Sequence, residues 1–114
     1  MSGQAWVKEF PVAATVCDTE GRIVEMNKRS IETFAADGGA ELLGKNVLDC
    51  HPEPSRTKLA GMMKDRRPNV YTIQKNGKKK LIYQAPWYED GVYAGFVELS
   101  FEIPRDLPHF NRDK

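Results

Sequence analysis

The chain is short, nearly neutral, and has the composition of a globular domain. Its 114 residues fit one domain and leave too little chain for two independent cores. The net charge of +1 favours neither nucleic acid nor a membrane surface as a partner. Apolar stretches fall short of the roughly 20 residues of a membrane helix, and the N-terminus lacks the pattern of a signal peptide. We therefore expect a cytoplasmic protein.

The first predicted element pair is a β-hairpin. Residues 12–17 and 22–26 are rich in β-branched side chains, and Asp18–Gly21 between them has the composition of a turn.

Two cysteines, Cys17 and Cys50, lack zinc-site spacing, so we expect free thiols and no metal.

The middle of the chain carries helical signals. Asn27 is a good N-cap, and Ile31 and Phe34 follow at helical spacing until two glycines end the pattern. A second helix is predicted to begin near Pro54 and to end before Pro68. Its apolar stripe consists of Leu59, Met62 and Met63.

The last third predicts a three-stranded antiparallel meander. Asn76-Gly77 and Asp90-Gly91 supply the positive φ angles of tight turns between residues 70–75, 78–88 and 92–103. In the last run we expect the apolar side to face the core and the polar side to face water. The apolar side carries Tyr93, Val97, Leu99, Phe101 and Ile103, and the polar side carries Glu98, Ser100 and Glu102.

Strands therefore form two blocks around a helical block, which is an α+β pattern. We divide the chain into an N-terminal cap segment (residues 1–10), a folded domain (residues 11–103) and a charged C-terminal tail (residues 104–114).

This order, with three local motifs, resembles the PAS family. The motifs are the hairpin Val16–Asn27, the helix link Leu42–Val47 and the closing meander Gly77–Val97. The resemblance covers roughly residues 10–103. It implies a five-stranded antiparallel sheet with short helices packed on one face.

The resemblance also implies a sensory, signal-transducing role and no enzymatic activity. The cavity between sheet and helices holds a small molecule in some members of the family and only side chains in others. We expect a small-ligand sensor that relays to a signalling partner protein. The alternative is a ligand-free protein–protein interaction or dimerisation module. Met1 and the charged tail favour a stand-alone PAS protein over the input module of a longer chain.

Cys50 and His51 are the first candidates for a ligand site, because they fall in the helical block that walls the cavity of PAS domains. The light-sensing flavin subfamily carries Gly-x-Asn-Cys, whereas this chain has Gly44-Lys45-Asn46-Val47, and the haem motif CxxCH is absent. The cofactor stays open, and we do not expect haem or flavin. A structural role for the pair is the simpler interpretation.

The other ligand-binding candidates are Met62, Tyr71, Tyr83, Trp87 and Leu99. Aromatic side chains could stack on a planar ligand, and methionine suits an adaptable pocket. A half-buried sheet also needs bulky residues for its core, so the packing interpretation stays open.

Trp6 and Phe10 are candidates for a dimer interface, because PAS domains often pair through a helical cap before the first strand. Trp6 could equally cover the sheet. We expect a homodimer.

No catalytic motif is present in the sequence, and adjacent residues such as Cys50 and His51 rarely present both side chains to one point.

Overall fold

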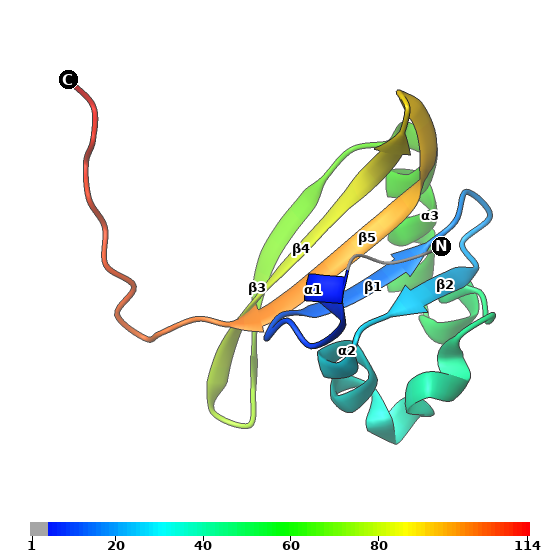
Figure 1. Cartoon of the computed structure of the whole chain (residues 1–114), viewed down its shortest axis with the longest axis horizontal. Helices are drawn as coiled ribbons and strands as arrows, with labels where there is room; N and C mark the ends of the chain where they lie inside the picture. Colours follow the sequence, from blue (N-terminus) through cyan, green and yellow to red (C-terminus); the bar gives the residue numbers. More distant parts are fainter. Residues whose placement is uncertain (1–4) are drawn as a thin grey trace.

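A five-stranded antiparallel sheet with strand order β2-β1-β5-β4-β3 forms the centre of the fold (Figure 1). The computed structural model describes residues 5–114, and residues 1–4 of the predicted cap segment lie outside the described residues. The strands are β1 (Ala13–Cys17), β2 (Ile23–Met26), β3 (Asn69–Lys75), β4 (Lys78–Glu89) and β5 (Val92–Glu102). The predicted α+β fold is confirmed.

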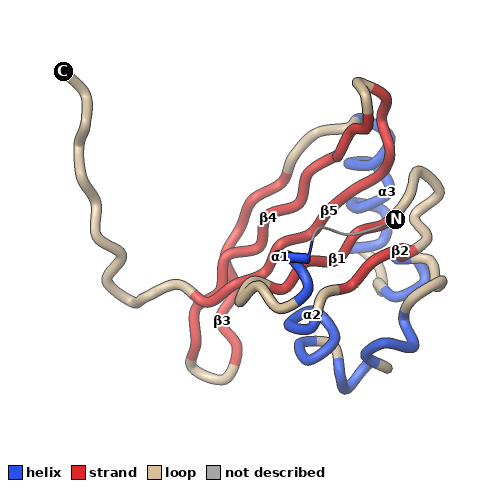
Figure 2. The backbone as a smooth tube through the Cα atoms, viewed as in Figure 1, coloured by secondary structure: helices blue, strands red, loops and turns tan. Residues whose placement is uncertain are grey.

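Helical segments fill the chain between β2 and β3, and one short helix precedes the sheet (Figure 2). The α-helices are α1 (Ala5–Lys8), α2 (Lys28–Thr33) and α3 (Ser55–Asp65). Three short 3₁₀ helices, η1 (Ala35–Asp37), η2 (Gly39–Leu42) and η3 (Val47–Cys50), lie between α2 and α3. The C-terminal tail runs away from the sheet without regular secondary structure (Figure 2).

Both predicted turns of the meander are confirmed. Asn76 and Asp90 have φ angles of 54° and 51°, and the glycines that follow them also have positive φ. Two successive residues with positive φ match the right-handed twist of a β-hairpin. These turns fix the register in which β4 pairs with β3 and with β5.

The prediction of which side of β5 faces the helices was right for Tyr93, whose hydroxyl donates to the backbone oxygen of Met63 of α3 over 3.3 Å, and wrong from Phe96 onward. Phe96 and Ser100 are buried, and Glu98 lines the cavity between the sheet and the helices. The inner side of β5 is therefore its more polar side. Val97 and Leu99 lie on the opposite side and are half-buried.

The reason for this reversal is a hydrogen bond between strands. Gln84 of β4 is the direct cross-strand partner of Glu98. Its Nε2 atom donates a hydrogen bond to Oε1 of Glu98 over 2.8 Å. Polar groups can turn inward when they find such partners, so hydrophobic alternation alone does not identify the inner face.

Asn27 ties the first strand to the helical block. Its side-chain oxygen accepts hydrogen bonds from the backbone N–H groups of Ala14 (3.0 Å) and Ser30 (2.9 Å), which confirms the predicted N-cap of α2. Its side-chain nitrogen donates to the backbone oxygens of Val7 (3.0 Å) and Val12 (2.7 Å). The residue is only 4% exposed, and its two bonds to the N–H groups of Ala14 and Ser30 are buried.

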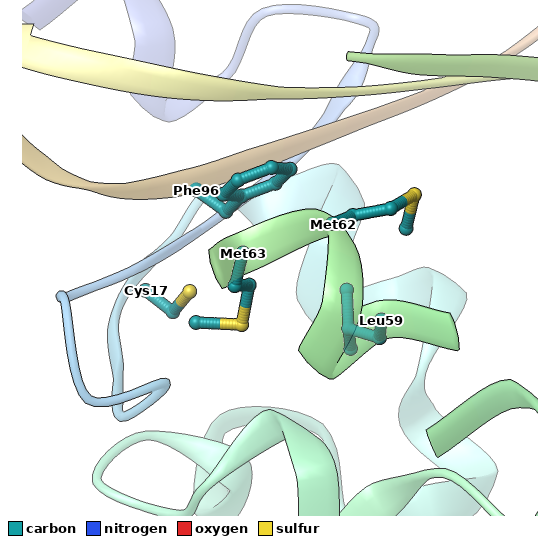
Figure 3. Close-up of a cluster of buried hydrophobic side chains, with 5 residues drawn as sticks. All are labelled: Cys17, Leu59, Met62, Met63 and Phe96. Atoms are coloured by element: carbon teal, nitrogen blue, oxygen red, sulfur yellow. The ribbon is translucent and has the colours of Figure 1, made fainter. Parts of the chain in front are cut away.

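The apolar core is divided into two clusters. The first joins β1, β5 and α3 and consists of Cys17, Leu59, Met62, Met63 and Phe96 (Figure 3). The second joins β2 and η2 and consists of Ile23, Met26 and Leu42. Val47 packs against both clusters. The predicted apolar stripe of the second helix is confirmed.

We predict that Asn27→Ala lowers the free energy of unfolding by about 3 kcal/mol, because it removes a helix cap and leaves buried backbone groups without partners. Urea denaturation followed by circular dichroism measures the change. The control is Asn111→Ala in the exposed tail, which should have almost no effect. A loss at Asn27 no larger than that of the control would contradict the role assigned to this side chain.

Candidate ligand-binding cavity

A cavity of about 840 Å³ lies between the inner face of the sheet and the helical segments. Its floor comes from the strands, with Thr15, Gln84, Phe96 and Glu98 among the lining residues. Its apolar wall includes Ile23, Met26, Leu42, Val47 and Leu59. The cavity therefore combines an apolar wall with a small polar floor.

The polar floor is a row of side chains that crosses four strands. Thr15, Glu98, Gln84 and Asn69 are successive cross-strand partners on β1, β5, β4 and β3. Asn69 donates from its amide nitrogen to Oε1 of Gln84 over 3.2 Å, and Gln84 donates to Glu98. Gln84 is only 7% exposed, so its amide is held by partners on both sides. At the other end of the row, the Thr15 hydroxyl pairs with the Ser30 hydroxyl.

Tyr71 stands beside this row on β3. Partial burial of this residue, which is 40% exposed, and, to a smaller extent, the negative charge of Glu98 raise the pKa of the Tyr71 hydroxyl. The hydroxyl therefore stays protonated and able to donate a hydrogen bond at neutral pH. Tyr71 is not among the residues that line the cavity, although the sequence placed it among the ligand-binding candidates.

Cys50 and His51 both line the cavity, as residues at and just after the end of η3. The Nδ1 atom of His51 lies 2.7 Å from the backbone oxygen of Val47. That contact leaves Nε2 as the ring nitrogen that a bound molecule can reach. Both cysteines are free, as predicted.

The second cysteine of the cavity, Cys17, was not among the candidates. Burial raises the pKa of its thiol, so the protonated form dominates at neutral pH. A protonated, buried thiol is a poor nucleophile. Cys17 therefore contributes packing to the first apolar cluster.

The remaining candidates lie away from the cavity wall. Met62 is buried in the first apolar cluster. Trp87 donates from its indole nitrogen to the backbone oxygen of Cys17 over 3.1 Å. Tyr83 and Leu99 are cross-strand partners on the outer face of the sheet. None of these four side chains is among the residues that line the cavity.

Three residues of the floor, Thr15, Gln84 and Glu98, were missed as site residues. Gln84 carried a signal, since it is a polar residue within the apolar part of a long predicted strand. Recognising the row required the register of the strands, which places these residues side by side.

Within residues 5–114 no three His, Cys, Asp or Glu side chains gather as a metal site would require. No helix in the described part of the chain is long and apolar enough to cross a bilayer.

Solved structures with a similar fold include PAS domains and sensor proteins. The PAS domain of BvgS from Bordetella pertussis has a TM-score of 0.64 at 20% identity, over 87% of this chain and 82% of that chain. A sensory box sensor histidine kinase from Vibrio cholerae has a TM-score of 0.62 at 16% identity, over 88% and 87%. The Aer2 receptor from Vibrio cholerae, described as a dual PAS-heme oxygen sensor, has a TM-score of 0.60 at 21% identity, over 82% and 95%.

Comparison of sequences points the same way. No curated protein matches the sequence. A family model described as PAS fold matches residues 7–65, which is more than half of the 114 residues. This fold is typical of sensory signal-transduction domains. The chain therefore belongs to the PAS family.

Proposed function

We propose that this PAS domain senses a small molecule that binds in the cavity and relays its presence to a signalling partner protein. The observation that carries the proposal is the cavity of about 840 Å³ above a hydrogen-bonded polar floor. Ligand sites commonly have volumes of about 300–1,000 Å³ and combine apolar walls with a few polar groups. Binding is the whole role of the domain in this proposal, and no catalytic step is assigned to it.

The cavity floor is connected to the helix that covers it. Glu98 and Phe96 share the inner side of β5, and Phe96 packs in one cluster with Met62 and Met63 of α3. A ligand on Glu98 would therefore favour some packings of α3 over others and shift their populations. Histidine kinases among the similar structures support a signalling protein as the partner that reads this change.

The cofactor stays a prediction, and we continue to expect neither haem nor flavin. Val47 stands where the flavin-binding relatives carry their reactive cysteine, and it is part of the packing between the two apolar clusters. A cytoplasmic location likewise stays a proposal.

We predict that Leu42→Phe fills the cavity and displaces the ligand, whereas Leu43→Phe does not. Leu42 is buried and lines the cavity, and its neighbour Leu43 is exposed and does not. Overfilling a packed site should weaken binding by about tenfold, the equivalent of about 1.4 kcal/mol. Mass spectrometry of the small molecules released on denaturation should find about tenfold less compound in Leu42→Phe than in wild type and Leu43→Phe.

Two results would contradict the proposal. The first is equal release from both variants. The second is a wild-type protein that releases nothing and whose melting temperature no compound of a metabolite library changes.

A second candidate function, dimerisation, rests on the exposed aromatic pair of the N-terminal segment. Trp6 and Phe10 are 64% and 44% exposed. Their rings pack edge to face with centroids 5.3 Å apart. A pair of large apolar rings at the surface is a common feature of protein interfaces. A homodimer formed through this segment is compatible with ligand binding in the cavity.

We predict that the wild-type protein dimerises at high concentration and that Trp6→Ser weakens the dimer by a factor of about 30, as loss of an aromatic anchor does. Light scattering coupled to size-exclusion chromatography measures both. Phe110→Ser, which removes an exposed ring from the tail, is the matched control and should leave the dimer intact. A wild-type chain that stays monomeric over the whole concentration range would remove this function.

A further inference from the structure

Glu98 places a carboxylate on the cavity floor, and no cation of the described residues forms an ion pair with it. The hydrogen bond from Gln84 reaches only Oε1 of the carboxylate. Within residues 5–114, the ion pairs of the structure do not include Glu98. A half-buried carboxylate is costly unless a donor or a cation compensates its lost hydration. The floor therefore has unused capacity to accept a hydrogen bond from a positively charged group.

The charged residues elsewhere on the cavity lining do not supply that cation. Arg22 and Lys45 are exposed, and Arg22, which directly precedes the edge strand β2, donates to the backbone oxygen of Gly44 over 3.4 Å. Asp37 and Asp49 also line the cavity and are exposed, and Asp49 pairs with Arg56 over 3.4 Å. The charge of the floor is that of Glu98 alone.

Aromatic and apolar side chains share the cavity lining with this carboxylate. Phe96 lies two residues before Glu98 on the same side of β5, and Phe34 lines the cavity from the helical block. Aromatic faces attract cations as well as apolar groups. The neighbouring wall of Ile23, Met26 and Leu42 can receive only an apolar body. The lining therefore fits a molecule with a positive nitrogen at one end and hydrocarbon at the other.

The carboxylate is also held in place before any ligand arrives. Asn69 fixes the amide of Gln84, and Gln84 in turn fixes Glu98, all on three adjacent paired strands. Preorganised acceptors lose little conformational entropy on binding, which increases affinity and selectivity.

We propose that the cavity binds a small organic cation, an amine, amidine or guanidine, whose N–H groups donate to Glu98 while its apolar body packs against the wall. This inference rests on the proposed function, because it names the class of ligand that the same cavity takes.

The test compares three probes of one shape and different charge on the wild-type protein. Benzamidine is a cation, benzamide is its neutral counterpart and benzoate is the anion. Backbone amide resonances of the ¹⁵N-labelled full chain report binding, with Thr15 and Phe96 as reporters on the floor. We expect benzamidine to shift these resonances with an affinity at least about tenfold above that of benzamide, as charge-assisted hydrogen bonds predict. Benzoate should bind most weakly.

Two matched variants then locate the charge that matters. Glu98→Gln removes it from the floor, and Glu102→Gln removes an exposed carboxylate further along the same side of β5. Benzamidine should bind about tenfold more weakly to Glu98→Gln, with benzamide unchanged, and Glu102→Gln should behave as wild type. If Glu98→Gln does not fold, the comparison of probes on the wild-type chain decides alone.

The results separate this inference from the proposed function. Benzamide or benzoate binding as tightly as benzamidine overturns the inference and leaves the cavity a ligand site. Absence of any shift with benzamidine at millimolar concentration also overturns it. Ligand binding in the cavity is then decided separately, by whether Leu42→Phe releases about tenfold less compound than wild type and Leu43→Phe.

Discussion

The hydrogen bond from Gln84 to Glu98 lies in the middle of the inner face of the sheet, and the packing of the helices adapts to it. Apolar side chains cannot cover a polar row without cost, because they offer it no hydrogen bonds. The core accordingly divides, with Phe96 and α3 on one side and Ile23 with Leu42 on the other. The cavity lies between the two clusters, and residues of both contribute to its lining next to the polar row.

The row itself depends on the register of the meander. Gln84 meets Glu98 and Asn69 only while β4 keeps its present pairing with both neighbours. A slip of one residue would move these side chains to the outer face. The turns at Asn76-Gly77 and Asp90-Gly91 prevent that slip, because their backbone angles suit only tight hairpins. Turn chemistry at the surface thus holds the floor of the cavity in place.

Local signals in the sequence predicted the features that depend on a few neighbouring residues. The turns, the Asn27 cap and the stripe of α3 belong to this group, and the family resemblance supplied their order in space. The inner side of β5 could not be predicted, because both of its sides carry large apolar residues and the choice depends on a partner on β4. The candidates Tyr83 and Leu99 lie on the outer face, whereas Cys50 and His51 line the cavity as their place in the helical block indicated.

A single measurement distinguishes a polar row kept for binding from one kept for stability: the free energy of unfolding of the double variant Gln84→Met/Glu98→Met. Replacing both partners of a buried polar pair by apolar groups of similar shape is close to neutral, whereas removing one partner is not. If the row serves the ligand, the double variant should be at least as stable as wild type in urea denaturation, and Glu98→Met alone should be less stable. A double variant less stable by about 2 kcal/mol or more, the cost of lost structural hydrogen bonds, would contradict this account.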